Sequence, residues 1–288
     1  MSVATLRADK REEWQLSAVG WVKYRSSFAD AGVPSVRRMI QLARPAPGGR
    51  VLDLACGVGV PAFDLADAVG PTGFVLGLDI AEAMVAGARR WAAAHAVTNV
   101  EFRTIPTEYE FDLPAAGFDA ATCRAGLQYM VEPGRAVRAV HEALKPGGRL
   151  VAMTVGSPQR CTSLRLLEDV VARHIDMPAL IPDPDPEVPG TVSLSDPADL
   201  EGLYHAAGFT DVTTEIADHP IVRAGSAEEY WDVCEQSAGP FILLLRSISP
   251  RLRDAIRADA IRELRSAFPT GPVVMTGETL ITTGTRTS

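Results

Sequence analysis

A glycine-rich segment and two aspartates carry the clearest chemical signal in this sequence. The segment Gly57-Val58-Gly59-Val60-Pro61-Ala62 follows an apolar run, and Asp53 lies inside that run. Glycines allow the backbone to approach a ligand closely, and a helix that begins after them presents free N–H groups. Asp79 lies 20 residues after Gly59, at the end of the next apolar run, where a carboxylate can accept hydrogen bonds from ribose hydroxyls. These residues together predict a nucleoside-containing ligand.

Two details bear on which nucleoside ligand this is. The segment fits the pattern G-x-G-x-x-G/A, which is also the fingerprint of a dinucleotide site. Asp53 would oppose a pyrophosphate, however, whereas it suits a ligand that carries an ammonium group. Pro61 removes a backbone donor that a phosphate would use. The residues favour an ammonium-bearing ligand, and an NAD-dependent oxidoreductase is the first alternative.

The elements that must position these residues alternate between strands and helices. The expected strands are Val51–Ala55, Gly73–Leu78, Val100–Thr104, Phe118–Cys123 and Leu150–Val155. The expected helices between them are Pro61–Val69, Ala81–Ala96 and Arg135–Leu144. Such alternation predicts parallel strands joined by crossover helices. The stretch Lys145-Pro146-Gly147-Gly148 is expected to end the last helix and turn the chain into the next strand.

The pattern changes after Val155. The expected elements are a loop at Ile181–Gly190, a helix from Ser195 or Asp196 to about Gly208, strands at Phe209–Ile216 and Thr279–Thr285, and helices at Ala227–Gln236 and Arg251–Ser266.

The fold predicted is an α/β, doubly wound, Rossmann-like sheet of seven strands, mostly parallel with an antiparallel final strand, and an α-helical cap. We expect an N-terminal helical lid over residues 1–45 and a cofactor-binding core over 46–156. Residues 157–288 would complete the sheet, with cap insertions at about 157–190 and 225–270.

Several segments, in order, resemble motifs of one enzyme family. The string VLDLACGVG resembles the first motif of the class I S-adenosylmethionine-dependent methyltransferases. It is followed by VLGLD, GFDAATCRAGLQYM and LKPGGRLV, which resemble the successive motifs of the branch that includes the ubiquinone- and menaquinone-biosynthesis methyltransferases. The later strings DPADLEGLYHAAGFTDV and SAEEYW are similar to bacterial members of that group. The resemblance covers nearly the whole chain and implies S-adenosyl-L-methionine as cofactor, with S-adenosyl-L-homocysteine as its product.

The resemblance also implies a set of cofactor contacts. They are Asp53, Ala55, Cys56, Gly57 and Gly59 for the methionine end, Asp79 for the ribose, Ile80 and Met84 for the adenine face, Thr107 and Glu108 for the adenine edge, and Arg124 and Ala125 near the reactive sulfur. This sequence departs from the family at Thr107, near which an Asp is expected, and at Ala55 and Val58, which replace the commoner Gly and Thr.

The acceptor is expected to be a small organic molecule, namely a bacterial secondary metabolite or a quinone-like or aromatic compound. A base is needed only if that acceptor must lose a proton. The candidates are Tyr24, on an aromatic helix face, and His174, in the region that should cover the substrate. Gln128 and Tyr129 are candidate polar contacts to the acceptor. The sequence shows no metal-ligand spacing and no Ser/His/Asp pattern, so no metal is expected.

The formal net charge of −8, without a run of Lys and Arg, argues against nucleic acid and membrane surfaces as partners. The N-terminus is polar, and the four cysteines are scattered, so we expect a cytoplasmic protein, monomeric or homodimeric. A protein that binds the cofactor without transferring methyl groups, and a protein or RNA acceptor, are the further alternatives.

Overall fold

The computed structural model describes residues 2–176, 185 and 187–287. Within them, one seven-stranded sheet has the order β3-β2-β1-β4-β5-β7-β6. The strands are β1 (Arg50–Leu54), β2 (Phe74–Asp79), β3 (Val100–Thr104), β4 (Phe118–Arg124), β5 (Leu144–Val155), β6 (Thr210–Ala224) and β7 (Val273–Thr285). Strands β1 to β5 pair in parallel, whereas β7 runs antiparallel to both β5 and β6. The predicted fold class is confirmed.

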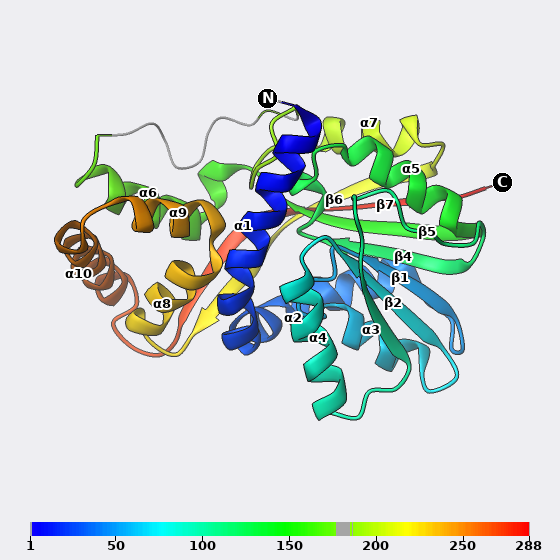
Figure 1. The fold of residues 1–288 in the computed structure, drawn as a ribbon, viewed down its shortest axis with the longest axis horizontal. Coiled ribbons are helices and arrows are strands. Elements are labelled where there is room, and N and C mark those ends of the chain that lie inside the picture. Colours follow the sequence, from blue (N-terminus) through cyan, green and yellow to red (C-terminus); the bar gives the residue numbers. More distant parts are fainter. Residues whose placement is uncertain (1, 177–184, 186, 288) are drawn as a thin grey trace.

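Helices cover the sheet and extend beyond it on one side (Figure 1). They are α1 (Val3–Lys23), α2 (Arg25–Ala43), α3 (Ala62–Val69), α4 (Glu82–Ala94), α5 (Pro133–Ala143), α6 (Thr162–Ala172), α7 (Pro197–Ala206), α8 (Ala227–Ser237), α9 (Gly239–Ser247) and α10 (Pro250–Ala267), with short 3-10 turns η1 (Leu127–Tyr129) and η2 (Pro158–Arg160). Among the described residues, no helix has both the length and the apolar character needed to cross a membrane.

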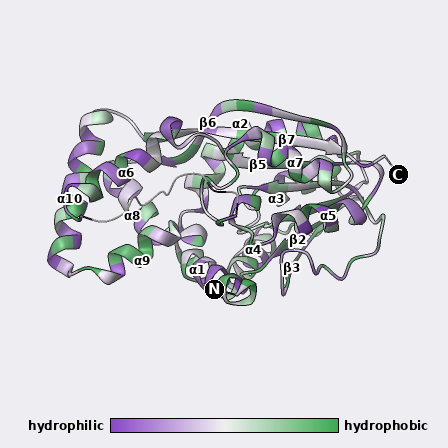
Figure 2. Ribbon diagram, turned by 90° about the horizontal axis from the view of Figure 1, so that it is seen from above, coloured by the Kyte–Doolittle hydropathy of each residue, from purple (hydrophilic) through white to green (hydrophobic). Residues whose placement is uncertain are grey.

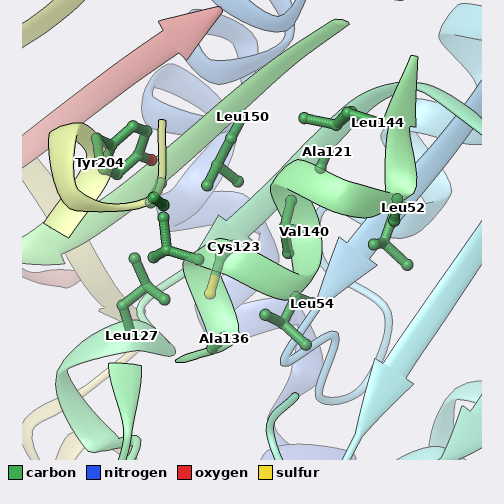
Figure 3. Close-up of a cluster of buried hydrophobic side chains, with 14 of the residues drawn as sticks. Leu52, Leu54, Ala121, Cys123, Leu127, Ala136, Val140, Leu144, Leu150 and Tyr204 are labelled. Atoms are coloured by element: carbon green, nitrogen blue, oxygen red, sulfur yellow. The ribbon is translucent and has the colours of Figure 1, made fainter. Parts of the chain in front are cut away.

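The main core lies between the sheet and the helices α5 and α7 (Figure 3). Helix α5 contributes Val137 and Val140, which share one face at helical spacing and are fully buried. Four of the five residues of β1 are buried as well, which explains why this strand is an almost continuous apolar run in the sequence. The core fixes the carboxyl ends of β1, β2 and β4 at one edge of the sheet, where the glycine segment begins.

A second core joins α6, α8, α9 and α10 to the far ends of β6 and β7. Helix α10 alternates hydrophilic and hydrophobic residues (Figure 2), and its buried positions are Ile256, Ala260, Ile261 and Leu264. This cap stands beside the sheet, and α1 crosses between the two (Figure 1), in contact with α8, α9 and α4. Helix α2 packs instead on β6 and β5. The N-terminal region therefore contains two helices with different surroundings.

Several boundaries differ from those predicted. Strand β5 begins at Leu144 and runs through the expected turn, because Gly147 takes a left-handed φ of 82° and its N–H donates to the carbonyl of Arg286. Strands β6 and β7 are longer than predicted, since they continue past the sheet into the cap. Helix α9 lies within Ser226–Ala267, a stretch expected to be helical in long pieces, between the two clearest helices predicted there. Half of the expected loop at Ile181–Gly190, namely residues 181–184 and 186, lies outside the described residues.

Candidate functional site

Asp79 organises the glycine segment. Its Oδ2 accepts a hydrogen bond of 2.9 Å from the N–H of Gly57, and its Oδ1 accepts one of 2.9 Å from the N–H of Ala81. One carboxylate thus holds both the loop after β1 and the first turn of α4. Burial raises the pKa of Asp79, while the backbone donors act in the opposite direction.

The two glycines of the loop are required for different reasons. Gly57 has a φ of 52°, and a Cβ added there would meet nothing within 4 Å, so the space beside it is open to a ligand. Gly59 has a φ of 89°, and a Cβ there would lie 2.1 Å from the ring of Phe63. Gly59 therefore allows the loop to pack on α3, whereas Gly57 leaves room at the edge of the sheet.

Asp53 lies beneath this loop and is fully buried. Its Oδ1 accepts a hydrogen bond of 2.7 Å from Thr122 Oγ1, and its Oδ2 has no hydrogen-bond partner. Because burial disfavours the ionised form, the pKa of Asp53 is raised to about 7. An unpaired carboxylate oxygen of this kind suits an ammonium group above the loop, although Asp53 itself stands behind the cavity wall.

A cavity of about 280 Å³ opens at this edge of the sheet and continues beneath α1 into the cap. We call its two ends the cofactor half and the acceptor half. The cofactor half is lined by residues from the ends of β1, β2 and β3, namely Ala55, Cys56, Gly57, Val58, Asp79, Ile80, Met84, Ile105 and Glu108. The acceptor half is lined by residues from α6, β6, α8 and the start of α9, together with Trp21 and Phe28.

The cofactor half fits the predicted nucleoside ligand. Ile80 and Met84 give it an apolar wall, and Asp79 lines it with carboxylate oxygens that can accept further hydrogen bonds. The space beside Gly57 is open, and the unpaired oxygen of Asp53 lies behind the cavity wall. The apolar wall and the carboxylate oxygens therefore match a ligand that has an apolar base, ribose hydroxyls and an ammonium group.

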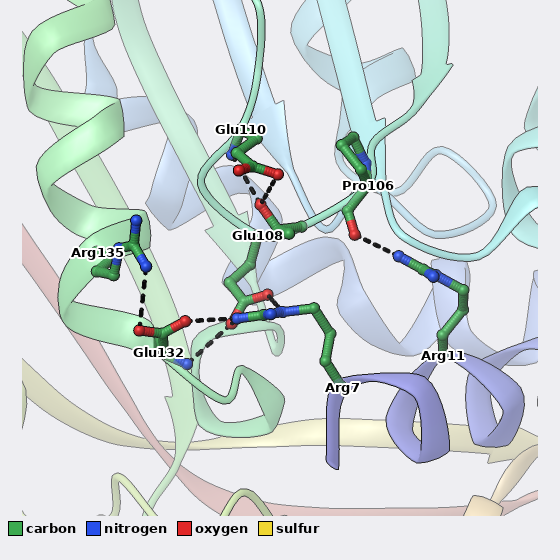
Figure 4. Close-up of polar contacts among 8 residues, drawn as sticks. Arg7, Arg11, Pro106, Glu108, Glu110, Glu132 and Arg135 are labelled. Atoms are coloured by element: carbon green, nitrogen blue, oxygen red, sulfur yellow. Dashed lines mark hydrogen bonds and ion pairs between the residues drawn. The ribbon is translucent and has the colours of Figure 1, made fainter. Parts of the chain in front are cut away.

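Glu108 is held by partners from two other segments (Figure 4). The Arg7 guanidinium of α1 donates to Glu108 at 2.7 Å and to Glu132, before α5, at 2.6 Å. The N–H of Glu132 also donates to Glu108 at 2.9 Å. Glu108 lines the cofactor half as predicted, but these contacts tie the first helix to the sheet edge. Thr107 lies outside the cavity lining, where its hydroxyl bonds Glu110.

Arg124 and Gln128 line the cavity and carry buried polar atoms without a partner. Arg124 ends β4, and its Nε has no hydrogen-bond partner. Burial lowers its pKa. Gln128 is 1% exposed, and neither its amide nitrogen nor its amide oxygen has a partner. Because buried polar atoms are normally satisfied, these two side chains point to polar groups of a bound ligand. Ala125 and Tyr129 line the cavity as well.

The acceptor half is mainly apolar and aromatic. The rings of Trp21 and Phe28 stack at 3.9 Å between centroids. Trp14 meets the edge of the Tyr129 ring at 4.9 Å, and the Tyr129 hydroxyl donates to Thr191. The remaining wall is formed by Met153, Val155, Cys161, Leu167, Ile221, Val222, Tyr230, Val233 and Cys234. These surroundings suit a molecule with a planar, apolar body.

The two predicted bases lie elsewhere. Tyr24 is buried in the second core, and its hydroxyl accepts a hydrogen bond from Gln236 Nε2. The His174 ring nitrogen Nε2 bonds Asp259 at 2.7 Å, which joins the end of α6 to α10. Neither side chain lines the cavity, so we assign no catalytic role to either.

Sequence reasoning missed the polar side chains that α1 presents to the cavity. They are Arg7, Lys10 and Glu13, spaced three residues apart and followed by Trp14. Such spacing places them along one helix face, and this is the feature of the sequence that could have identified them as cavity-lining residues. The sequence did not identify which cap residues line the cavity. Their segments are ordinary amphipathic helices, and the residues that face inward depend on the tertiary fold.

Comparisons with known proteins agree with this geometry. Residues 45–186 match a family model described as a methyltransferase domain. The chain is 27% identical to the nocamycin O-methyltransferase of Saccharothrix syringae over 276 residues, covering 87% of this chain and 90% of that one. It is 35% identical over 109 residues to the ubiquinone biosynthesis O-methyltransferase of Acinetobacter baumannii, covering 38% of this chain and 44% of that one. The fold is similar to that of YcgJ from Bacillus subtilis, with a TM-score of 0.57 at 19% identity, over 89% of this chain and 99% of that one.

Proposed function

Because the chain belongs to the class I S-adenosylmethionine-dependent methyltransferases, we propose that it methylates an oxygen atom of a small, largely apolar acceptor. The observation that carries this proposal is the continuity of the cavity. Residues of the cofactor half and of the apolar acceptor half line one and the same cavity, and Arg124 and Gln128 line it too. A methyl group carried on the ligand in one half would therefore face a molecule held in the other.

When bound, the cofactor would supply a methyl group on a sulfonium sulfur, and an acceptor atom would attack the methyl carbon and displace the neutral sulfide. The chain must hold the acceptor in line with that methyl group and keep water out. Proper alignment can contribute about 7–11 kcal/mol to lowering the barrier. The stacked rings of Trp21 and Phe28, with the apolar wall behind them, serve to orient a planar acceptor and to exclude water.

The cofactor contacts predicted from the sequence form part of this proposal. Asp79 would bind the ribose through oxygens that already order the loop. The adenine would lie against Ile80 and Met84, and the sulfur would lie close to Arg124 and Ala125. Asp53 would act from below the loop on the ammonium group. Helix α1 would cover the cofactor and separate it from solvent.

The acceptor contacts are proposed on similar grounds. Gln128 has an unsatisfied donor and an unsatisfied acceptor, so it suits a substrate with a hydroxyl or carbonyl oxygen. Tyr129 supports that position through its bond to Thr191. The aromatic lining favours a quinone-like or aromatic compound, and the similarity to the nocamycin enzyme favours oxygen as the methylated atom and secondary metabolism as the context. A monomeric or homodimeric state and a cytoplasmic location stay predictions.

A methylation screen tests this function. The chain is incubated with S-adenosylmethionine and a panel of phenols, hydroxyquinones and aromatic acids, and each compound is examined by mass spectrometry for the gain of a methyl group. We expect methylation of apolar hydroxylated members, and none with Asp79→Ala. Binding of S-adenosylhomocysteine without methylation of any compound would instead favour a cofactor-binding protein that does not transfer methyl groups.

A further inference from the structure

Glu13 is the carboxylate closest to the cap among the described cavity-lining residues. The other lining carboxylates, Asp79 and Glu108, belong to the cofactor half and already accept hydrogen bonds from backbone or arginine donors. Glu13 is 9% exposed and lies against the start of α9. Its Oε1 and Cδ lie 2.4 Å and 2.8 Å from the position of a Cβ added to Gly239, so a side chain at this position would displace the Glu13 carboxylate.

The two oxygens of Glu13 have different surroundings. Oε2 accepts a hydrogen bond of 2.9 Å from the ammonium group of Lys10, one turn earlier on α1. Oε1 accepts no hydrogen bond from any residue that the structure describes. Lys10 thus fixes the orientation of the carboxylate and leaves one oxygen available to a ligand. Oε1 does not belong to the buried polar atoms that lack a partner, and Glu13 lines the cavity, so a bound molecule can reach this oxygen.

The other titratable groups in this part of the cavity are poor proton acceptors. Burial raises the pKa of Tyr129 to about 12, and the negative charge of Glu13 acts in the same direction. Burial also raises the pKa of Cys161 to about 11 and that of Cys234 to about 12. These groups keep their protons at neutral pH. The side chain of Gln128 does not titrate.

We propose that Glu13 accepts the proton of the acceptor hydroxyl during methyl transfer, an inference that rests on the proposed function. The O–H bond breaks, and its electron pair stays on the acceptor oxygen while the proton passes to Glu13 Oε1. The bond between that oxygen and the methyl carbon forms as the methyl–sulfur bond breaks, and the latter electron pair stays on sulfur. Glu13 later returns the proton to solvent.

This role restricts the acceptor class. An acceptor that is already anionic, such as a carboxylate, needs no base and would be repelled by Glu13. A neutral phenol or enol donates a hydrogen bond to Oε1 before the reaction and places its oxygen beside the carboxylate. The acceptor is therefore a neutral hydroxyl compound with an apolar, planar body.

The test compares Glu13→Gln with Glu12→Gln, a control at an exposed position of the same helix. The substrates are the phenol methylated in the screen and ring-substituted analogues of increasing acidity. We expect Glu13→Gln to lower kcat by about 10²–10⁴-fold with the least acidic phenol, and by progressively less as the phenol becomes more acidic. The affinity for S-adenosylhomocysteine should be unchanged in both variants.

Each other outcome has a distinct meaning. Equal kcat in Glu13→Gln and wild type would overturn the role of Glu13 while methyl transfer stands. A loss of the same size for every phenol, or a loss of cofactor affinity, would indicate a structural role and also overturn it. Glu13→Asp, which keeps a carboxylate, should recover part of the rate. Wild-type methylation of carboxylates alone would overturn the acceptor class.

Discussion

The two halves of the cavity are built in different ways. The cofactor half is made of strand ends and backbone, and one carboxylate, that of Asp79, holds Gly57 and Ala81 in place. The acceptor half is made of side chains from α1, α6, β6, α8 and α9, which meet only because the chain folds back on itself. The first half is a local structure that a short sequence motif specifies. The second is a product of tertiary packing.

We therefore expect the architecture of the cofactor half to be general and that of the acceptor half to be particular to this chain. A backbone cradle can bind the same ligand in many proteins, because it depends on glycines and a few hydrogen bonds. A side-chain wall can be altered without disturbing that cradle. Substitutions in the two halves should therefore have separable effects on cofactor binding and on acceptor use.

The largest effect is expected at Asp79. Asp79→Ala removes two charge-assisted hydrogen bonds that order the loop, as well as the proposed ribose contact. The affinity for S-adenosylhomocysteine should fall by about 100-fold, which corresponds to about 2.7 kcal/mol. Isothermal titration calorimetry measures it, with Asp67→Asn on the exposed face of α3 as control. Equal affinities in Asp79→Ala and wild type would exclude Asp79 from the cofactor site.

The next effect should be confined to the acceptor half. Trp21→Ala removes a ring that stacks on Phe28 and donates to the carbonyl of Ser237. We expect kcat/KM for the methylated phenol to fall by about 30-fold, since an aromatic anchor of a binding pocket contributes about 2 kcal/mol. Cofactor affinity should change by less than about twofold. Val19→Ala, at an exposed position on α1, is the control. A parallel loss of both functions would show that the halves are coupled.

A third prediction concerns pH and the buried carboxyl of Asp53. Its folded pKa of about 7 exceeds the usual value of 3.8, so the folded state retains a proton that the unfolded state has lost between these limits. The free energy of unfolding should therefore decrease as pH rises from about 4 to about 7, by at most about 1.4 kcal/mol per pH unit from this group. Urea unfolding across this range measures the slope. Asp53→Asn should remove this contribution, and an unchanged slope in the variant would contradict it.

The smallest effect is expected at the contact that ties α1 to the sheet edge. Arg7→Ala removes the pairs with Glu108 and Glu132, which are only partly exposed. We expect S-adenosylhomocysteine to dissociate about fivefold faster, from a loss of about 1 kcal/mol, because α1 covers the cofactor half. Stopped-flow displacement measures the rate, and Arg37→Ala on an exposed face of α2 is the control. An unchanged rate would mean that α1 does not limit release.

Most residues predicted to contact the cofactor line one end of the cavity, because their signals in the sequence are local, and their contacts with the cofactor stay predictions. The glycines, Asp79 and the apolar strands lie within short stretches, and their spacing follows from the fold class. Thr107 was expected at the adenine edge but lies outside the cavity lining. The short turn after β3 that carries it is not positioned by the spacing of the glycines and strands. Tyr24 and His174 were chosen as bases from residue type, and the structure places Tyr24 in the second core and His174 against Asp259, outside the cavity lining. Glu13 was missed because its position depends on how α1 lies across the molecule.

The central claim is that the cofactor half binds S-adenosylmethionine next to an acceptor pocket. The most direct test is calorimetric titration of the wild-type chain with S-adenosylhomocysteine and, separately, with NADH. We predict saturable binding of S-adenosylhomocysteine at a single site and no binding of NADH. Binding of NADH without binding of S-adenosylhomocysteine would contradict the account.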